Sequence, residues 1–202
     1  YIVSAASGAG KTSLLRALMA QDTGLVISVS HTTRAPRPGE VEGRDYYFVD
    51  DAEFVRLIDA GAFLEHAHVF DRRYGTTHAA VEADLLAGRD VLVEIDWQGA
   101  RQIRQRVPEC VSVFILPPSE EALLARLRGL NQDSDSVIAA RMAAAVSEMS
   151  HCEEYDYLVW NDDFEVALAD LSAIIRARRL RRERQRLEHS DALARLTHDP
   201  KL

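Results

Sequence analysis

The sequence predicts an α/β fold in which helices flank a parallel sheet of five strands. Five short apolar runs read as buried strands, at residues 1–6, 26–30, 91–95, 111–116 and 157–160. They alternate with helical patterns at residues 11–21, 51–60, 77–88, 98–106, 119–128, 134–151 and 163–188. Strands that alternate with helices are typical of a parallel sheet with crossover helices.

Length and composition limit the class of protein. A chain of 202 residues is large enough for one well-buried domain with a smaller insertion, and too small for two full domains. Charged residues make up 28% and apolar residues 47%, as in an ordinary soluble globular protein. No apolar run approaches the ~18 residues that span a bilayer, so we expect no membrane partner. The widely separated Cys110 and Cys152 fit a reducing cytosol better than a disulfide framework, and we expect a cytoplasmic protein.

The net charge of −8 argues against a nucleic-acid partner, because the protein as a whole should repel polyanions. The predicted C-terminal helix is rich in arginine, but Glu183 and Glu188 are interspersed and no aromatic residues are interleaved with the arginines, so a solvated face is the preferred interpretation. Leu180 and Leu187 are one heptad apart, which makes contact in a homo-oligomer the second interpretation.

The segment Ser4–Thr12 organises the chain. It follows the first apolar run and opens a helical pattern, and strand, glycine turn, Lys-Thr and helix together predict a phosphate-binding P-loop. Gly8 and Gly10 allow the backbone to approach an anion, Lys11 is expected to reach the β/γ oxygens, and the Thr12 hydroxyl is expected to ligate Mg²⁺. Ala5 stands where the usual pattern begins with glycine, and the alternative is an ordinary glycine-rich turn.

The segment from His31 to Tyr74 interrupts the alternation and predicts an insertion at the carboxyl ends of the strands, where ligands bind in such folds. It holds Arg34 and Arg37 in a proline-containing loop, followed by a strand signal at residues 45–49. Arginine pairs bind phosphate through charge-assisted bonds, and Ser30, Tyr46 and Tyr74 offer further donors. The alternative is an exposed basic loop.

Asp96 follows the third predicted strand of the sheet. A carboxylate at this strand tip, opposite Thr12, is a candidate to hold Mg²⁺ directly or through water. Asp96 is also a candidate to contact a nucleotide base, and the sequence does not distinguish this role from metal binding.

The whole set of motifs, in this order, resembles the guanylate kinases of the bacterial type, over nearly the whole chain. The matching segments are Ser4–Thr12, Val29–Arg34, Pro38–Val41, Gly43–Tyr46, Phe63–Ala67, Tyr74–Thr76, Glu94–Gly99, Ile115–Ser119, Asp156–Tyr157 and Asn161–Asp162. The resemblance implies a P-loop core at residues 1–30, 77–125 and 147–202, a GMP-binding arm at 31–76 and a helical lid at 126–146. It implies Mg²⁺-dependent transfer of the ATP γ-phosphoryl group to GMP, and to dGMP, giving ADP and GDP.

The resemblance also implies the site residues. ATP would contact Ser7, Gly8, Ala9, Gly10, Lys11, Thr12, Ser13 and Arg126. GMP would contact Ser30, Arg34, Arg37, Tyr46, Glu65, Tyr74, Thr76 and Asp96. Thr12 and Asp96 would hold the metal, and the catalytic cations would be Lys11, Arg34, Arg37, Arg128 and Arg141.

Two departures from the family pattern stand out. Leu130 occupies a place that usually holds a phosphate-contacting arginine, and Asp71-Arg72-Arg73 replaces Gly-Asn-Tyr before Tyr74. Two rivals remain: a related kinase with another phosphorylated acceptor, and a guanylate-kinase-like protein-binding module without activity. The intact phosphate loop argues against the second, and Glu65 with Tyr74-Gly75-Thr76 argues for guanine as the base.

Overall fold

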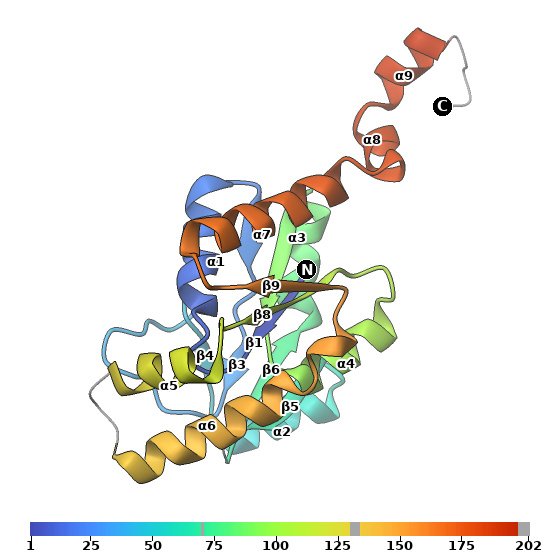
Figure 1. The fold of residues 1–202 in the computed structure, drawn as a ribbon. Coiled ribbons are helices and arrows are strands. Elements are labelled where there is room, and N and C mark those ends of the chain that lie inside the picture. Colours follow the sequence, from blue (N-terminus) through green and yellow to red (C-terminus); the bar gives the residue numbers. More distant parts are fainter. Residues whose placement is uncertain (70, 130–133, 198–202) are drawn as a thin grey trace.

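The computed structural model describes residues 1–69, 71–129 and 134–197. Its central sheet has five parallel strands, as predicted (Figure 1). Their order across the sheet is β2 (Leu25–Ile27), β7 (Asp90–Glu94), β1 (Ile2–Ala5), β8 (Ser112–Leu116) and β9 (Tyr157–Trp160). Parallel pairing places the carboxyl ends of all five strands at one edge of the sheet, with every pair of neighbours in parallel register.

Alternation of side chains along the strands divides the core between the two faces of the sheet. On one face, Val3 and Leu92 pack with the apolar sides of α1 (Lys11–Gln21) and α7 (Phe164–Arg179). On the other face, Ile2 and Val91 pack with α3 (His78–Leu86) and α4 (Trp97–Arg106). Continuous apolar strands are therefore required, because both faces of the sheet are covered.

The predicted insertion forms a second sheet of four strands. Its order is β4 (Tyr47–Phe48), β3 (His31–Thr32), β6 (Arg72–Thr77) and β5 (Phe63–Val69), and α2 (Asp51–Asp59) packs beside it. The ring of Phe54, on α2, stacks on Phe63 with centroids 4.5 Å apart. The strand expected at residues 45–49 is shorter than predicted, and the sequence analysis missed β3, β5 and β6, which are mostly polar.

Asp71, in the altered loop before Tyr74, has a φ of 60°. Aspartate tolerates this left-handed conformation better than most residues with a Cβ. The Asp71-Arg72-Arg73 sequence of this chain is therefore compatible with a turn at this place.

Two helices, α5 (Glu120–Gly129) and α6 (Asp135–Met149), cover the phosphate loop in the region predicted as the lid. Leu123, Leu127, Ile138 and Ala145 form a small core of their own with Ala6 of the loop. Leu130, on which the departure from the family pattern depends, lies outside the described residues.

The prediction of one helix over residues 163–188 is wrong. The chain leaves α7 after Arg179, and α8 (Arg182–Glu188) and α9 (Ser190–Thr197) extend away from the core (Figure 1). Arg181 takes an extended conformation, with φ −62° and ψ 141°, which breaks the helix. The heptad spacing of Leu180 and Leu187 thus does not place them on one continuous helix.

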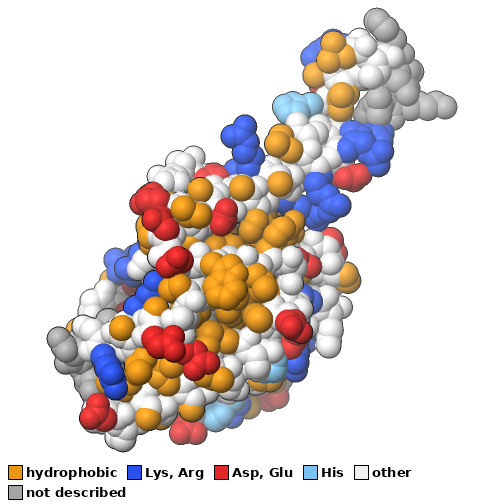
Figure 2. Space-filling model, viewed as in Figure 1, with side chains coloured by type: hydrophobic (Ala, Val, Ile, Leu, Met, Phe, Trp, Pro, Cys, Tyr) orange, Lys and Arg blue, Asp and Glu red, His pale blue; other side chains and the backbone are white. Residues whose placement is uncertain are grey.

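Strand β9 lies at the outer edge of the sheet and carries exposed apolar side chains. Leu158 and Trp160 are 45% and 56% exposed, and Figure 2 shows hydrophobic side chains gathered in the centre of this face. Among the described residues, no helix combines the length and apolar character needed to cross a membrane.

Arg179 joins α7 to the sheet, since its guanidinium donates to Asp90 and Asp22 at 2.6 Å each. The Asp90 side chain is only 9% exposed, so Arg179→Ala leaves a nearly buried carboxylate with Arg184 alone, at 3.3 Å. We expect urea unfolding to show a loss of about 2 kcal/mol for this variant. The exposed pair of Arg182 with Glu183 gives the control: Arg182→Ala should cost less than about 0.5 kcal/mol. Equal losses in the two variants would contradict the role of Arg179.

Candidate active site

The phosphate loop has the predicted strand, glycine turn and helix geometry. Gly8 and Gly10 have φ values of 89° and 96°, which residues with a Cβ rarely adopt, and Gly10 is the N-cap of α1. The side chain of Asn161, which directly follows β9, donates from Nδ2 to the Ala9 carbonyl at 2.6 Å. A Cβ on Gly10 would lie 2.4 Å from the same nitrogen. The buried Asn161 side chain therefore holds the loop, and glycine is required at position 10 for space as well as for its φ.

Lys11 and Thr12 meet a carboxylate that the sequence analysis did not single out. Glu94, the last residue of β7, has its Oε1 3.1 Å from Thr12 Oγ1 and 3.6 Å from Lys11 Nζ. Asp96, the residue predicted to lie opposite Thr12, instead accepts from the amide of Gly99 at 2.9 Å and is the N-cap of α4. A signal was present in the sequence, since Glu94 ends a strand that neighbours β1.

Helices α5 and α6 bring arginines to the phosphate loop. From α5, Arg126 donates to the carbonyls of Asn161 at 2.8 Å and Ala9 at 3.4 Å, and from α6, Arg141 donates to Ser7 Oγ at 3.1 Å. Glu148, also on α6, accepts from the Ser7 amide at 3.0 Å, and burial raises the pKa of its carboxyl. Arg128 is exposed and, two residues from Arg126, points to a different side of α5.

On the second sheet, the predicted phosphate-binding side chains lie together with one acidic residue that the analysis had not assigned. Arg34 donates from Nη1 and Nη2 to the carboxylate of Glu40 at 3.0 and 2.8 Å, and its Cζ lies 5.3 Å from the centre of the Tyr46 ring. The Tyr46 ring packs edge-on against Tyr74, at 6.1 Å between centroids. Glu40 also accepts from the amide of Arg37 at 2.7 Å, although the Arg37 side chain is exposed. Glu40 thus fixes both the loop and the direction of Arg34.

Next to this cluster, Ser30 Oγ and Thr76 Oγ1 are 3.0 Å apart and Glu65 is 2% exposed. The pairing of β5 with β6 is irregular between Phe63 and Glu65, and such irregularities re-aim side chains beside functional sites. Burial raises the pKa of Glu65 to about 7, hydrogen bonds from Thr76 partly oppose this, and the charge of Asp96 adds to it. The charge of Arg106 lowers the pKa of Glu65 only in part, and a buried carboxyl with a raised pKa fits a ligand-binding group.

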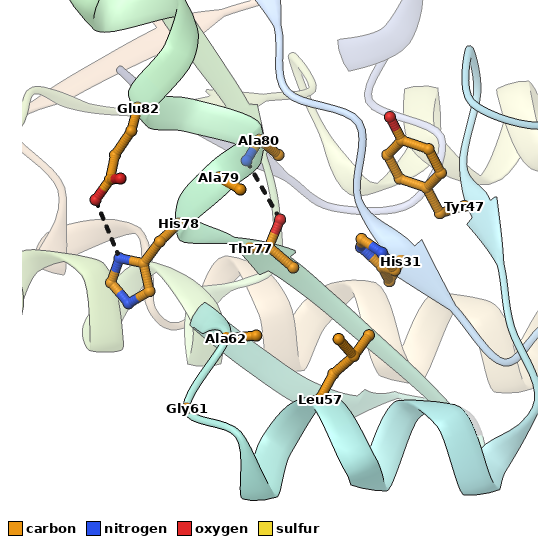
Figure 3. Close-up of a pocket in the computed structure, with 10 residues that line it drawn as sticks. All are labelled: His31, Tyr47, Leu57, Gly61, Ala62, Thr77, His78, Ala79, Ala80 and Glu82. Atoms are coloured by element: carbon orange, nitrogen blue, oxygen red, sulfur yellow. Dashed lines mark hydrogen bonds and ion pairs between the residues drawn. The ribbon is translucent and has the colours of Figure 1, made fainter.

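A hollow of about 590 Å³ is lined by residues of β3 and β4, by the end of α2 and by the start of α3 (Figure 3). His31, Tyr47 and Thr77 line it, each directly after Ser30, Tyr46 and Thr76 in the chain. Side chains alternate between the faces of a strand, so this hollow is separate from the predicted GMP site.

The fold and the phosphate loop define a P-loop phosphotransferase, and a cluster of Arg34, Tyr46 and Tyr74 lies on its second sheet. Residues 1–178 match the sequence model of a family, guanylate kinase. The chain belongs to the guanylate kinase family, whose members phosphorylate GMP with ATP. The resemblance found in the sequence is thereby confirmed.

Individual relatives agree with this assignment. The chain is 61% identical to a guanylate kinase of Methylococcus capsulatus over 92% of this chain and 91% of that protein. It is 57% identical to a guanylate kinase of Escherichia coli K12 over 98% of this chain and 97% of that protein. A crystal structure of guanylate kinase from Anaplasma phagocytophilum superposes with a TM-score of 0.75 at 39% identity, covering 91% of this chain and 87% of that one.

Glu65 should destabilise the protein at neutral pH. The pKa of Glu65 in the folded protein, about 7, lies above the usual 4.5, so the folded state binds a proton more tightly than the unfolded state. This tighter binding adds to the free energy of unfolding in full below pH 4.5, and the addition is lost as the pH rises through 7. We expect Glu65→Gln to be more stable than the parent at pH 8, by up to about 3 kcal/mol, and the difference to vanish near pH 4.5. Chemical denaturation at both pH values measures this, with Glu109→Gln at an exposed carboxyl as the control. A difference that does not depend on pH would contradict the burial argument.

Proposed function

We propose that this chain catalyses the Mg²⁺-dependent transfer of the ATP γ-phosphoryl group to GMP and dGMP, with ATP on the phosphate loop and GMP on the second sheet. The assignment of GMP to the second sheet rests on one observation. Glu65 is nearly buried there, beside the cluster of Ser30, Arg34, Tyr46 and Tyr74. The family assignment supports the reaction, giving ADP and GDP.

On the ATP side, loop amides and the N-terminus of α1 bind the phosphates. The proposed contacts are Ser7, Gly8, Ala9, Gly10, Lys11, Thr12, Ser13 and Arg126. Arg141, which contacts Ser7, and Arg128 supply further positive charge from the lid as the γ-phosphoryl group moves.

On the GMP side, Ser30, Arg34, Arg37, Tyr46 and Tyr74 bind the phosphate, and Glu65, Thr76 and Asp96 lie at the base. Guanine presents its N1–H and N2–H₂ donors side by side, and an ionised Glu65 accepts from both. Adenine has an acceptor at N1, so it would leave buried groups unpaired, and such sites reject the wrong ligand strongly.

No general base is required, because a phosphomonoester loses its second proton with a pKa of about 6 and the acceptor oxygen is already ionised. Catalysis then depends on positioning the two phosphates and on neutralising charge. Lys11, Arg34 and Arg37 are the proposed groups, together with the lid arginines.

The oxygen donors near Thr12 fit Mg²⁺. The Thr12 hydroxyl and the Glu94 carboxylate are hard ligands 3.1 Å apart, and Asp96 remains the alternative carboxylate. The part of the chain that the structure describes holds no group of three or more His, Cys, Asp or Glu suited to a metal, which fits an ion bound largely by phosphates and water. Mg²⁺ would neutralise and orient the phosphates.

The proposal also covers the location of the protein in the cell and contact between copies of the chain. We infer a cytoplasmic location, supported by Cys110 and Cys152, which are both free thiols. Contact between copies of the chain is supported by the exposed apolar side chains on β9.

A coupled ADP-release assay with Mg·ATP tests the function. We expect turnover with GMP and dGMP, none above background with AMP, UMP or CMP, and complete loss on adding excess EDTA. Comparable turnover of AMP would contradict the assignment of the base contacts.

Variants of the two carboxylates distinguish their roles. Glu94→Gln should raise the Mg²⁺ concentration for half-maximal rate several-fold, with little change in the KM for GMP. Asp96→Asn should mainly raise the KM for GMP. The reverse pattern, from Mg²⁺ titrations at saturating nucleotide, would assign the metal to Asp96.

A further inference from the structure

Gly99 is a buried glycine in the first turn of α4, directly beside Glu65. An ideal Cβ on Gly99 would lie 2.4 Å from Glu65 Oε2 and 3.1 Å from its Cδ. The first separation is shorter than any real carbon–oxygen contact of this kind, so the carboxylate occupies the space that a side chain at position 99 would need.

The backbone does not explain a glycine at this position. Gly99 is not among the residues with positive φ, and it lies inside a regular helix. Glycine is one of the least favourable residues within a helix, and alanine is the most favourable. Its amide bonds to Asp96 Oδ1 at 2.9 Å, as any non-proline residue at this third helical position would.

Glu65 has little room to move away from an added methyl group. The side chain is 2% exposed, and its neighbours include Thr76, whose hydrogen bonds lower the pKa of Glu65, and Asp96, whose charge raises it. Displacement toward Asp96 is opposed by like charge, so an added methyl group would force the carboxylate out of its present position beside Thr76.

We propose that Gly99 is a positioning residue that sets the place of the Glu65 carboxylate and thereby the selectivity for guanine. This inference rests on the proposed role of Glu65 at the base. Gly99 itself touches no substrate: it acts by having no side chain.

The test compares the parent with Gly99→Ala, Glu65→Ala and the double variant, by steady-state kinetics with GMP, IMP and ATP. Because a displacement of about 1 Å can cost about 100-fold, we expect Gly99→Ala to raise the KM for GMP by 10- to 100-fold. The KM for ATP should stay within about twofold. IMP lacks the 2-amino group, so the preference for GMP over IMP should fall toward that of Glu65→Ala.

The double variant shows whether Gly99 acts through Glu65. With alanine at position 65 the added methyl group meets no carboxylate, so Gly99→Ala should change the KM for GMP by less than about twofold in that background. Gly129→Ala, at the end of α5 where a Cβ meets no atom within 4 Å, is a control for the thermal midpoint alone.

Each contrary result has a distinct meaning. An unchanged KM for GMP in Gly99→Ala, with a raised KM in Glu65→Ala, overturns the inference and leaves the proposed function intact. The same increase with and without the Glu65 carboxylate also overturns it. An unchanged KM in Glu65→Ala removes both the role of Glu65 and the inference built on it.

Discussion

The parallel register of the five strands is the constraint on which the site depends. It brings the ends of β1, β7 and β9 to one edge, where the phosphate loop, Glu94 and Asn161 meet. The hydrogen bond from Asn161 to Ala9 then joins residues 152 positions apart. Asn161 follows the edge strand β9 and holds the loop in place, so the loop amides are oriented before any anion binds. This reduces the conformational entropy that is lost on binding.

The second sheet holds a cation, Arg34, and a buried carboxylate, Glu65, that do not neutralise each other by forming an ion pair. Arg34 is paired with Glu40 and stacked on Tyr46, so its direction is fixed although its charge is partly balanced. A guanidinium has five N–H donors, and two of them reach Glu40. Glu65, in contrast, is nearly buried and pairs with Thr76 of β6, so in the proposed site a ligand with both a phosphate and hydrogen-bond donors can satisfy Arg34 and Glu65 at once.

The sequence predicted the central sheet and the phosphate loop well because continuous apolar runs and a glycine turn are local signals. It failed at the C-terminal helix, where helical residues continue past Leu180 but Arg179 and Arg184 both turn to Asp90, a contact distant in sequence. It also missed β3, β5 and β6, in which polar residues such as His66, Arg73 and Thr76 break up any apolar run. The positions of Glu94 and Asp96 depend on where β7 ends and α4 begins, and a shift of two residues exchanges their surroundings.

Selectivity and stability are opposed at Glu65. In the proposed role, burial makes an unpaired hydrogen-bonding group costly, which would allow the carboxylate to distinguish guanine from adenine. The same burial raises the pKa of Glu65 to about 7 and disfavours the ionised form in the empty site. A ligand that donates two hydrogen bonds stabilises the ionised form, so binding of GMP and ionisation of Glu65 are linked. Gly99 belongs to the same balance, because a glycine inside α4 weakens the helix but leaves room for the charge. The protein thus accepts local instability in β5 and α4 at the place where we propose that guanine binds.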